Sequence, residues 1–165
     1  MVKRIFKEAI PFVIIIAVVL LFKQFIATPI QVNGDSMYPT LKNGDLMLLN
    51  KLGYNFGSIN RFDIVVVDKG DSFIIKRVIG LPGEHIEYID SKLYIDGEEI
   101  EETFLEENVH TYDFEAYASE NCYFVMGDNR PISLDSRELG CFDISKIKGK
   151  TSFTFFPFSR LGFKS

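Results

Sequence analysis

The chain begins with a long apolar stretch. Residues 9–22 carry no charge, and the apolar run resumes after Lys23 and Gln24 and continues to Thr28. Residues 9–28 number 20, about the length that an α-helix needs to cross the hydrocarbon core of a bilayer. The Lys23 ammonium can reach the headgroups along its flexible stem. The pattern therefore predicts a transmembrane anchor over 9–28, a short tail over 1–8 and a separate domain over 29–165.

The charges beside this stretch predict its orientation. Lys3, Arg4 and Lys7 precede it, and basic residues next to a membrane span are retained in the cytoplasm. The tail would then be cytoplasmic and the domain extracytoplasmic, in a single-pass protein of the cell membrane. A cleaved secretory signal is the alternative, but 25–27 does not form a small-x-small cleavage site and Pro29 follows closely. A buried core helix is disfavoured because the stretch has no polar face.

The remainder of the chain shows the short apolar runs of β-strands rather than helical periodicity. Asp96-Gly97 inside one of these runs is a strong hairpin signal. After residue 30 the best helix candidate is 99–108, which is mostly acidic. The aromatic segment 153–163 is interpreted as a core strand and the chain end, with a surface resting on the membrane as the alternative. The predicted fold is mainly β, a single antiparallel domain on a membrane stalk, with strands at 30–33, 46–49, 64–67, 73–79, 93–100, 123–126 and 151–156.

Composition and charge narrow the possible functions. With 47% hydrophobic and 25% charged residues, the 165-residue chain is globular and has room for one domain. Residues 1–27 hold four basic and one acidic side chain, a net charge of +3, so the remaining 14 basic and 22 acidic side chains give −8. Nucleic acid is excluded as a partner, because phosphate binding needs clustered Lys and Arg.

A first candidate for chemistry is Ser36, which lies between Gly34 and Pro39. The glycine permits a tight turn and the proline fixes the loop, so the Ser36 hydroxyl and backbone N–H could both face a ligand. On this evidence alone, a serine that only forms the turn is the more common case.

A second candidate is Lys76. Strand alternation over 73–79 puts Lys76 on one apolar face and Arg77 on the other. A free lysine has a pKa of about 10.4 and is almost fully protonated at neutral pH, but burial among aliphatic side chains lowers the pKa. Such a lysine can act as a general base. The alternative is that both cations pair with carboxylates or reach solvent at a sheet edge.

A third candidate is the loop 127–137, which follows an apolar strand and concentrates hydroxyl, carboxylate and guanidinium groups. Side chains of these types can order a site through ion pairs and hydrogen bonds. A solvated surface loop is the more common structure for this composition.

Taken together, these segments resemble the conserved boxes of bacterial type I signal peptidases. Residues 36–40 are similar to the nucleophile box, 76–84 to the lysine box and 127–137 to the last box. Residues 44–45 resemble the box that follows the nucleophile, and 156–163 resemble the usual chain end. The short interval before residue 127 excludes the large second domain of some members, so the chain resembles the compact Gram-positive type. The family fold is built around coiled antiparallel sheets, which agrees with the predicted strands.

The resemblance implies a serine endopeptidase that removes signal peptides from exported preproteins on the outer side of the membrane. Ser36 would attack the scissile carbonyl while neutral Lys76 takes its proton and later returns it to the leaving amine. Ser133 falls at the position that hydrogen-bonds and orients the lysine. The positions that hold the site together without reacting are Asp128, Asp135 and Arg137.

The resemblance also implies where the oxyanion and the substrate bind. The Ser36 backbone N–H would bind the oxyanion, whereas Gly34 stands where many Gram-negative members carry a second, hydroxyl donor, so that donor is left open. The substrate would bind extended by β-augmentation, with small residues one and three positions before the cut. The strands expected beside it contain Ile30, Gln31, Val32, Asn33, Gly34, Asp35, Phe73, Ile74 and Ile75.

No cofactor or metal is expected. His85 and His110 are the only histidines, and neither has the spacing to Cys or carboxylates of a metal site. Two rival functions are a different Ser–Lys protease, which the complete last box disfavours, and a catalytically inactive binding module in which Ser36 and Lys76 are structural. Cleavage of a synthetic signal peptide separates these hypotheses, because the peptidase alone cuts after a small residue.

Cys122 and Cys141 flank the loop 127–137. If their segments run antiparallel as neighbours, the two sulfur atoms could form a disulfide, which the expected extracytoplasmic location permits. Neither cysteine belongs to the family boxes, and the alternative is two small buried hydrophobic side chains. The sequence leaves both possibilities open.

Overall fold

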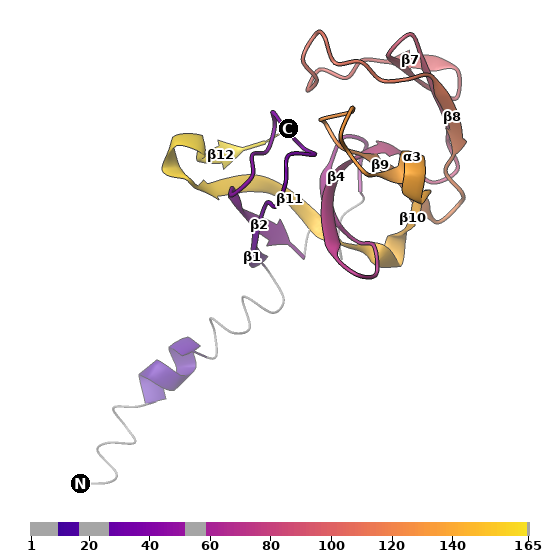
Figure 1. The fold of residues 1–165 in the computed structure, drawn as a ribbon. Coiled ribbons are helices and arrows are strands. Elements are labelled where there is room, and N and C mark those ends of the chain that lie inside the picture. The colour runs from indigo at the N-terminus through magenta and orange to yellow at the C-terminus, as the bar shows by residue number, and fades with distance from the viewer. Residues whose placement is uncertain (1–9, 17–26, 52–58, 165) are drawn as a thin grey trace, which may run out of the picture.

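The computed structural model of the protein describes residues 10–16, 27–51 and 59–164. Residues 10–16 are helical (Figure 1). The predicted tail 1–8 and half of the predicted anchor 9–28 lie outside the described residues, so the division into tail, anchor and domain stays a prediction. Within the described residues, no helix is both long and apolar enough to span a bilayer.

Eight strands form the larger sheet, and each neighbouring pair is antiparallel. In sheet order they are β1 (Ala27–Gln31), β2 (Leu46–Asn50), β11 (Ile147–Phe156), β3 (Ile64–Asp68), β4 (Phe73–Gly80), β9 (Cys122–Met126) and β10 (Phe142–Asp143), and β12 (Gly162–Phe163) pairs with β11. The long β11 crosses the molecule and pairs with both β2 and β3 (Figure 1). Because three strands separate β1 from β4, these two strands run in the same direction.

The curl of this sheet follows from irregular pairing along β11. Its register shifts once against β3 and twice against β2. An extra residue on one strand of a pair bends that strand and increases its twist. The sheet therefore wraps around its own core, which is why strands distant in sheet order can approach the same site.

Four further strands form a smaller antiparallel sheet. In order they are β7 (Glu98–Ile100), β6 (Lys92–Ile95), β5 (His85–Ile89) and β8 (Phe114–Tyr117). Figure 1 shows β7 and β8 at the upper right, on the side of the strands away from β1 and β2. Alternate residues of this sheet, including Ile86 and Tyr88, pack on Phe124 and Met126 of β9. The short helices are α3 (Ser136–Leu139), η1 (Ile144–Lys146) and η2 (Phe158–Arg160).

Two more apolar clusters fill the larger sheet. The first lies between β3, β4, β9 and β11, where β-branched residues such as Val65, Val78 and Val125 are fully buried. The second packs under the loop after β1 and contains Met37, Leu41 and other side chains of low exposure. Burying each such side chain contributes roughly 1.5–3 kcal/mol, so this second cluster holds the Ser36 loop against the sheet.

The predicted mainly β fold of curled antiparallel sheets is confirmed, and each predicted strand overlaps an observed one. Asp96-Gly97 forms the turn between β6 and β7, with φ values of 51° and 85°. The helix candidate 99–108 is wrong, because β7 covers its start and the rest is turn and irregular backbone. Tertiary contacts determine the conformation of this segment, because Glu102 pairs with Arg130 and Phe104 packs on Phe62. The strands β5, β8, β10 and β12 were not predicted.

Candidate active site

The loop that carries Ser36 follows β1 and is closed at its base by two backbone hydrogen bonds. The Val32 N–H donates to the Asp45 carbonyl and the Gly44 N–H donates to the Val32 carbonyl, both at 2.9 Å. Inside the loop, Leu41 N–H donates to the Met37 carbonyl at 2.8 Å, and both side chains are buried. Ser36 itself is half-buried, with its hydroxyl toward β4.

Lys76 reaches this hydroxyl from β4. Its Nζ donates to Ser36 Oγ at 2.6 Å and to the Ile75 carbonyl at 3.1 Å, and the residue is 3% exposed. Burial lowers the pKa of Lys76 to about 8, against the opposing charges of Asp135 and Asp128. A substantial fraction of Lys76 is therefore neutral near pH 8, and a neutral amine at this distance can accept the serine proton.

The neighbouring cation of the same strand has a different role. Arg77 donates from Nε and Nη2 to the two oxygens of Asp128 at 2.9 and 2.7 Å, and both side chains are almost fully buried. The guanidinium carbon lies 3.8 Å from the centroid of the Phe104 ring. Thr40 Oγ1 also donates to Asp128, at 2.6 Å. Arg77 thus pairs with a carboxylate, as in the alternative that the sequence left open, and the pair ties β4 to the Ser36 loop.

Asn129, in the loop 127–137, forms two hydrogen bonds to the backbone of the Ser36 loop. Its backbone N–H donates to the Ser36 carbonyl at 3.0 Å, and its Nδ2 donates to the Asp35 carbonyl at 3.1 Å. Sequence reasoning did not single out this residue. The sequence offered one clue to its role: Asn129 directly follows Gly127-Asp128, and asparagine side chains commonly form hydrogen bonds to the backbone of turns.

Asp135 and Arg137 fix the second half of the last box. Asp135 is fully buried and accepts from the Gly127 N–H at 2.9 Å and from Arg137 Nε at 2.9 Å. Burial opposes ionisation of Asp135, but the Arg137 guanidinium and the Gly127 N–H outweigh it and hold the pKa of the carboxyl below its usual value. Asp135 also caps α3, and Arg137 Nη2 donates to the Arg130 carbonyl at 2.8 Å.

Ser133 and Gly127 meet beside the Ser36 loop. Ser133 Oγ is buried and does not bond to Lys76 in this structure; it lies near the Asp135 carboxylate, where it helps to hold the pKa of that carboxyl below its usual value. A Cβ added at Gly127 would overlap Ser133 Oγ and the Ser36 carbonyl oxygen, and would lie 2.6 Å from Ser133 Cβ. Only glycine therefore lets the last box pack between these two serines.

Two backbone N–H groups near Ser36 differ in whether they already donate a hydrogen bond. Within the described residues, the Ser36 N–H donates no hydrogen bond, so it is available to an oxyanion. The Gly34 N–H donates to Asn43 Oδ1 at 3.0 Å. Gly34 has φ +92°, a conformation that favours glycine, and it has no side chain to offer as a second donor.

A groove of about 780 Å³ runs from the Ser36–Lys76 pair between β1 and β4. Among the described strands, the N-terminal half of β4 pairs with β3 alone, since its pairing with β9 begins at Arg77, and β1 pairs with β2 alone. Two sheet edges are thus open to an extended peptide. Gly34 and Asp35 of the predicted substrate segment do not line the groove. The predicted residues that do are Ile30, Gln31, Val32, Asn33, Phe73, Ile74 and Ile75.

Arg130 joins the last box to the smaller sheet and was not singled out from the sequence. Its guanidinium is almost fully buried and pairs with Glu102. It also donates to the Tyr88 hydroxyl at 2.9 Å, to Thr111 Oγ1 at 3.1 Å and to the Gly127 carbonyl at 3.1 Å. This network holds the smaller sheet against the segment that supports the site.

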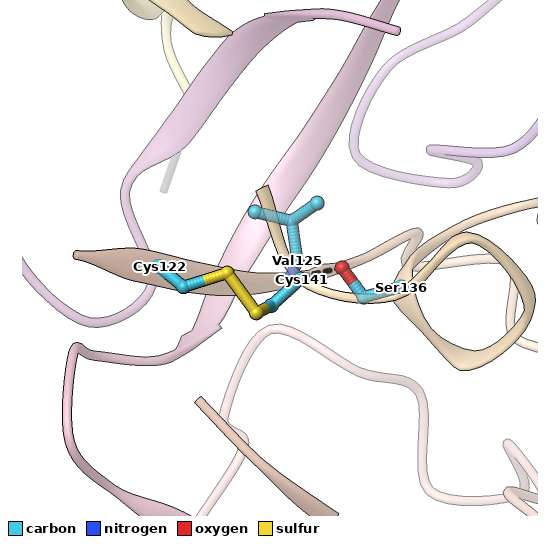
Figure 2. Close-up of a disulfide and its surroundings, with 4 residues drawn as sticks. All are labelled: Cys122, Val125, Ser136 and Cys141. Carbon is cyan, nitrogen blue, oxygen red and sulfur yellow. Dashed lines mark hydrogen bonds between the residues drawn. A yellow bond between two sulfur atoms is a disulfide. The ribbon is translucent and has the colours of Figure 1, made fainter. Parts of the chain in front are cut away.

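The disulfide left open by the sequence is present. Cys122 and Cys141 are bonded, with their Cα atoms 5.6 Å apart, because β9 and β10 run antiparallel as neighbours. Figure 2 shows that Ser136 lies close by, where its Oγ accepts a 2.9 Å hydrogen bond from the Val125 N–H. The bridge closes the segment that contains the last box.

The two histidines lie apart from this site. His85 contacts Glu115 at 2.9 Å on the smaller sheet, and His110 contacts Ser91 Oγ at 2.8 Å. Among the described residues, no three His, Cys, Asp or Glu side chains are grouped as metal ligands. A serine hydroxyl, a buried lysine amine and an open-edged groove lie together at this site, an arrangement that fits the class of serine peptidases.

Comparisons with known proteins identify the family. The family model described as signal peptidase, peptidase S26, matches residues 5–156. Signal peptidase I S of Bacillus subtilis is 40% identical over 171 residues, covering 96% of this chain and 93% of that protein. Signal peptidase IB of Staphylococcus aureus is 38% identical over 177 residues, covering 93% and 92%. A crystal structure of a signal peptidase I from Enterococcus faecalis V583 is 35% identical with a TM-score of 0.51, covering 56% of this chain and 96% of that one.

The chain therefore belongs to the signal peptidase family, peptidase S26, whose type I members remove signal peptides from secreted preproteins. The resemblance stated from the sequence is confirmed, including the likeness to the Gram-positive members.

Proposed function

We propose that the protein cleaves signal peptides with Ser36 as the nucleophile and Lys76 as the general base. The observation that carries this proposal is the 2.6 Å contact between the buried Lys76 amine and Ser36 Oγ. Neutral Lys76 takes the Ser36 proton as Oγ bonds to the scissile carbonyl carbon, and the oxyanion accepts from the Ser36 N–H. The lysine then protonates the leaving amine, and water releases the acyl group with the same base.

The supporting roles follow the same reasoning. Asp128 and Asn129 hold the Ser36 loop, and the Asp135–Arg137 pair orders the segment behind it. For Ser133 we propose the role of orienting Lys76. Its buried hydroxyl lies against Gly127 and interacts with the Asp135 carboxylate, the same group whose charge acts on the Lys76 amine.

The substrate is proposed to lie extended in the groove. Both β1 and β4 run toward Ser36, so a peptide can add backbone hydrogen bonds to either edge. Alternate side chains of an extended peptide point to the same wall. The residues one and three positions before the cut therefore face one wall, where apolar side chains such as Val32 and Ile75 favour small residues.

Signal peptidase I homologues are membrane-anchored, and we propose the same for this chain. Residues 9–28 would form the anchor, 1–8 a cytoplasmic tail and 29–165 an extracytoplasmic domain. The apolar length and the basic flank support this orientation. The Cys122–Cys141 disulfide supports the placement of the domain outside the membrane, where thiols are oxidised.

The test is cleavage of a synthetic signal peptide with alanine one and three positions before the cut. Mass spectrometry should find a single cut directly after the second alanine. Replacing either alanine by phenylalanine should abolish that cut. An intact peptide, or cuts that ignore these positions, would refute the proposal.

A further inference from the structure

The chain end returns to the base of the Ser36 loop. Arg160, in η2 between β11 and β12, donates from Nε to both oxygens of Asp45 at 3.1 Å and from Nη2 to one of them at 3.0 Å. The Asp45 side chain is 2% exposed and that of Arg160 is 22% exposed. This ion pair joins positions 115 residues apart and lies largely away from solvent.

The same guanidinium makes a second contact on the loop. Arg160 Nη2 donates to the Thr40 carbonyl at 3.0 Å. Thr40 is the last residue of the segment that begins at Ser36, and its own hydroxyl donates to Asp128. Asp45 ends the loop, where its carbonyl accepts from the Val32 N–H and its carboxylate accepts from the Lys42 N–H at 3.0 Å. Arg160 thus bridges two points of one loop.

The Ser36 loop is therefore held by three separate polar groups of the described structure. Asn129 holds the carbonyls of Asp35 and Ser36, and Asp128 holds the Thr40 hydroxyl. Arg160 holds the remaining side, through backbone and carboxylate together. The last box supplies the first two, and the chain end supplies the third.

We propose that Arg160 is a positioning residue for the peptidase reaction: it fixes the Ser36 loop so that Ser36 Oγ meets the Lys76 amine. This inference rests on the proposed roles of Ser36 and Lys76. A planar guanidinium that holds a carboxylate and a carbonyl at once sets orientation as well as distance, which a lysine cannot do. A displacement of about 1 Å at a reacting atom can cost roughly 10²-fold in rate.

The test uses the full chain in detergent with the synthetic signal peptide, and compares Arg160→Gln, Arg160→Lys and the double variant Asp45→Asn/Arg160→Gln. The single change to glutamine leaves the Asp45 carboxylate buried without its cation, so thermal stability should fall. The double variant removes both charges, so stability should largely return.

Catalysis should follow a different pattern from stability. We expect kcat to fall roughly 10²-fold in Arg160→Gln with little change in KM, and to stay low in the double variant because the Thr40 carbonyl still lacks its donor. Arg160→Lys, which keeps the charge and stays folded, should recover only part of kcat.

Arg61→Gln is the matched control. Arg61 pairs with Glu84 at 2.6 Å, with side chains 20% and 17% exposed, away from the Ser36 loop. It should lose stability with kcat unchanged. Full kcat in Arg160→Gln, or a kcat that recovers with stability in the double variant, would overturn the inference. Those outcomes leave the Ser36 and Lys76 proposal intact, since that proposal is tested by cleavage with the wild type and with variants of these two residues, in which Arg160 is unchanged.

Discussion

The amine of Lys76 lies 2.6 Å from the hydroxyl oxygen of Ser36, across 40 residues of sequence. The contact exists because β4 places the lysine beside the Ser36 loop while the Asn129 N–H holds the Ser36 carbonyl. Burial lowers the pKa of the amine, since the apolar surroundings disfavour its charge, and the base role proposed for Lys76 depends on this shift.

The first prediction concerns the pH dependence of cleavage. Because Lys76 must be neutral to accept a proton, kcat/KM should rise with pH through an apparent pKa of about 8. Measuring the profile of the wild type and of a variant with His85→Gln and His110→Gln checks the assignment. The two profiles should coincide, and a rise that disappears with the histidines would reject Lys76 as the titrating base.

The same shift has a consequence for stability. The folded protein holds the Lys76 proton with a pKa of about 8, against 10.5 for an unperturbed lysine, so between these values the unfolded chain binds more protons. The free energy of unfolding should therefore increase as pH rises from 8 to 10.5. Other groups titrate in this range, so the measurement is the difference in urea unfolding between the wild type and Lys76→Met. Equal slopes in both proteins would contradict the lowered pKa.

A third prediction follows from the close packing at Gly127. Gly127→Ala places a methyl group against Ser133 Oγ and the Ser36 carbonyl oxygen, so one of the two serines must move. We expect kcat to fall by roughly 10²-fold. Gly70→Ala is the control: Gly70 has φ +108° and open space around its Cα, so it should cost about 1 kcal/mol of stability and no activity. Full activity in Gly127→Ala would show that the packing is looser than described.

A fourth prediction concerns the disulfide between Cys122 and Cys141. Reduction should lower the stability of the fold by about 3 kcal/mol, which loop-closure entropy allows for the 19-residue separation. Catalysis in the still-folded protein should persist, because Ser136 continues to hold Val125 and neither sulfur has a chemical role. Thiol counting on unfolded, unreduced protein from an oxidising compartment should find no free thiol. Two free thiols would rule out the bridge.

Much of the fold could be predicted because the local pattern of apolar residues and turn residues marks most of the strands. Short apolar runs located β2, β3, β4 and β9, and Asp96-Gly97 located a hairpin. The segment 99–108 could not be read locally. Its charges suggested an exposed helix, whereas Glu102 serves a buried arginine distant in sequence. A polar side chain that local sequence places in solvent can therefore be the partner of a buried residue far away in the chain.

The candidate site likewise contains some residues that the sequence indicated and others that only the folded structure reveals. The resemblance of residues 36–40 to the nucleophile box pointed to Ser36, but strand alternation alone did not decide whether Lys76 or Arg77 faced it. Asn129 and Arg160 act through contacts 94 and 115 residues away in sequence, which no local pattern encodes. Only the folded chain brings these groups to one loop.

The central claim is that Ser36 and Lys76 act as a pair, and the most direct measurement is cleavage of the synthetic signal peptide by Ser36→Ala, Lys76→Ala and the double variant. Each single change should lower kcat by roughly 10⁴-fold or more, and the double variant should be little worse than either. Circular dichroism should show that all three remain folded. Substantial cleavage by folded Lys76→Ala would contradict the account.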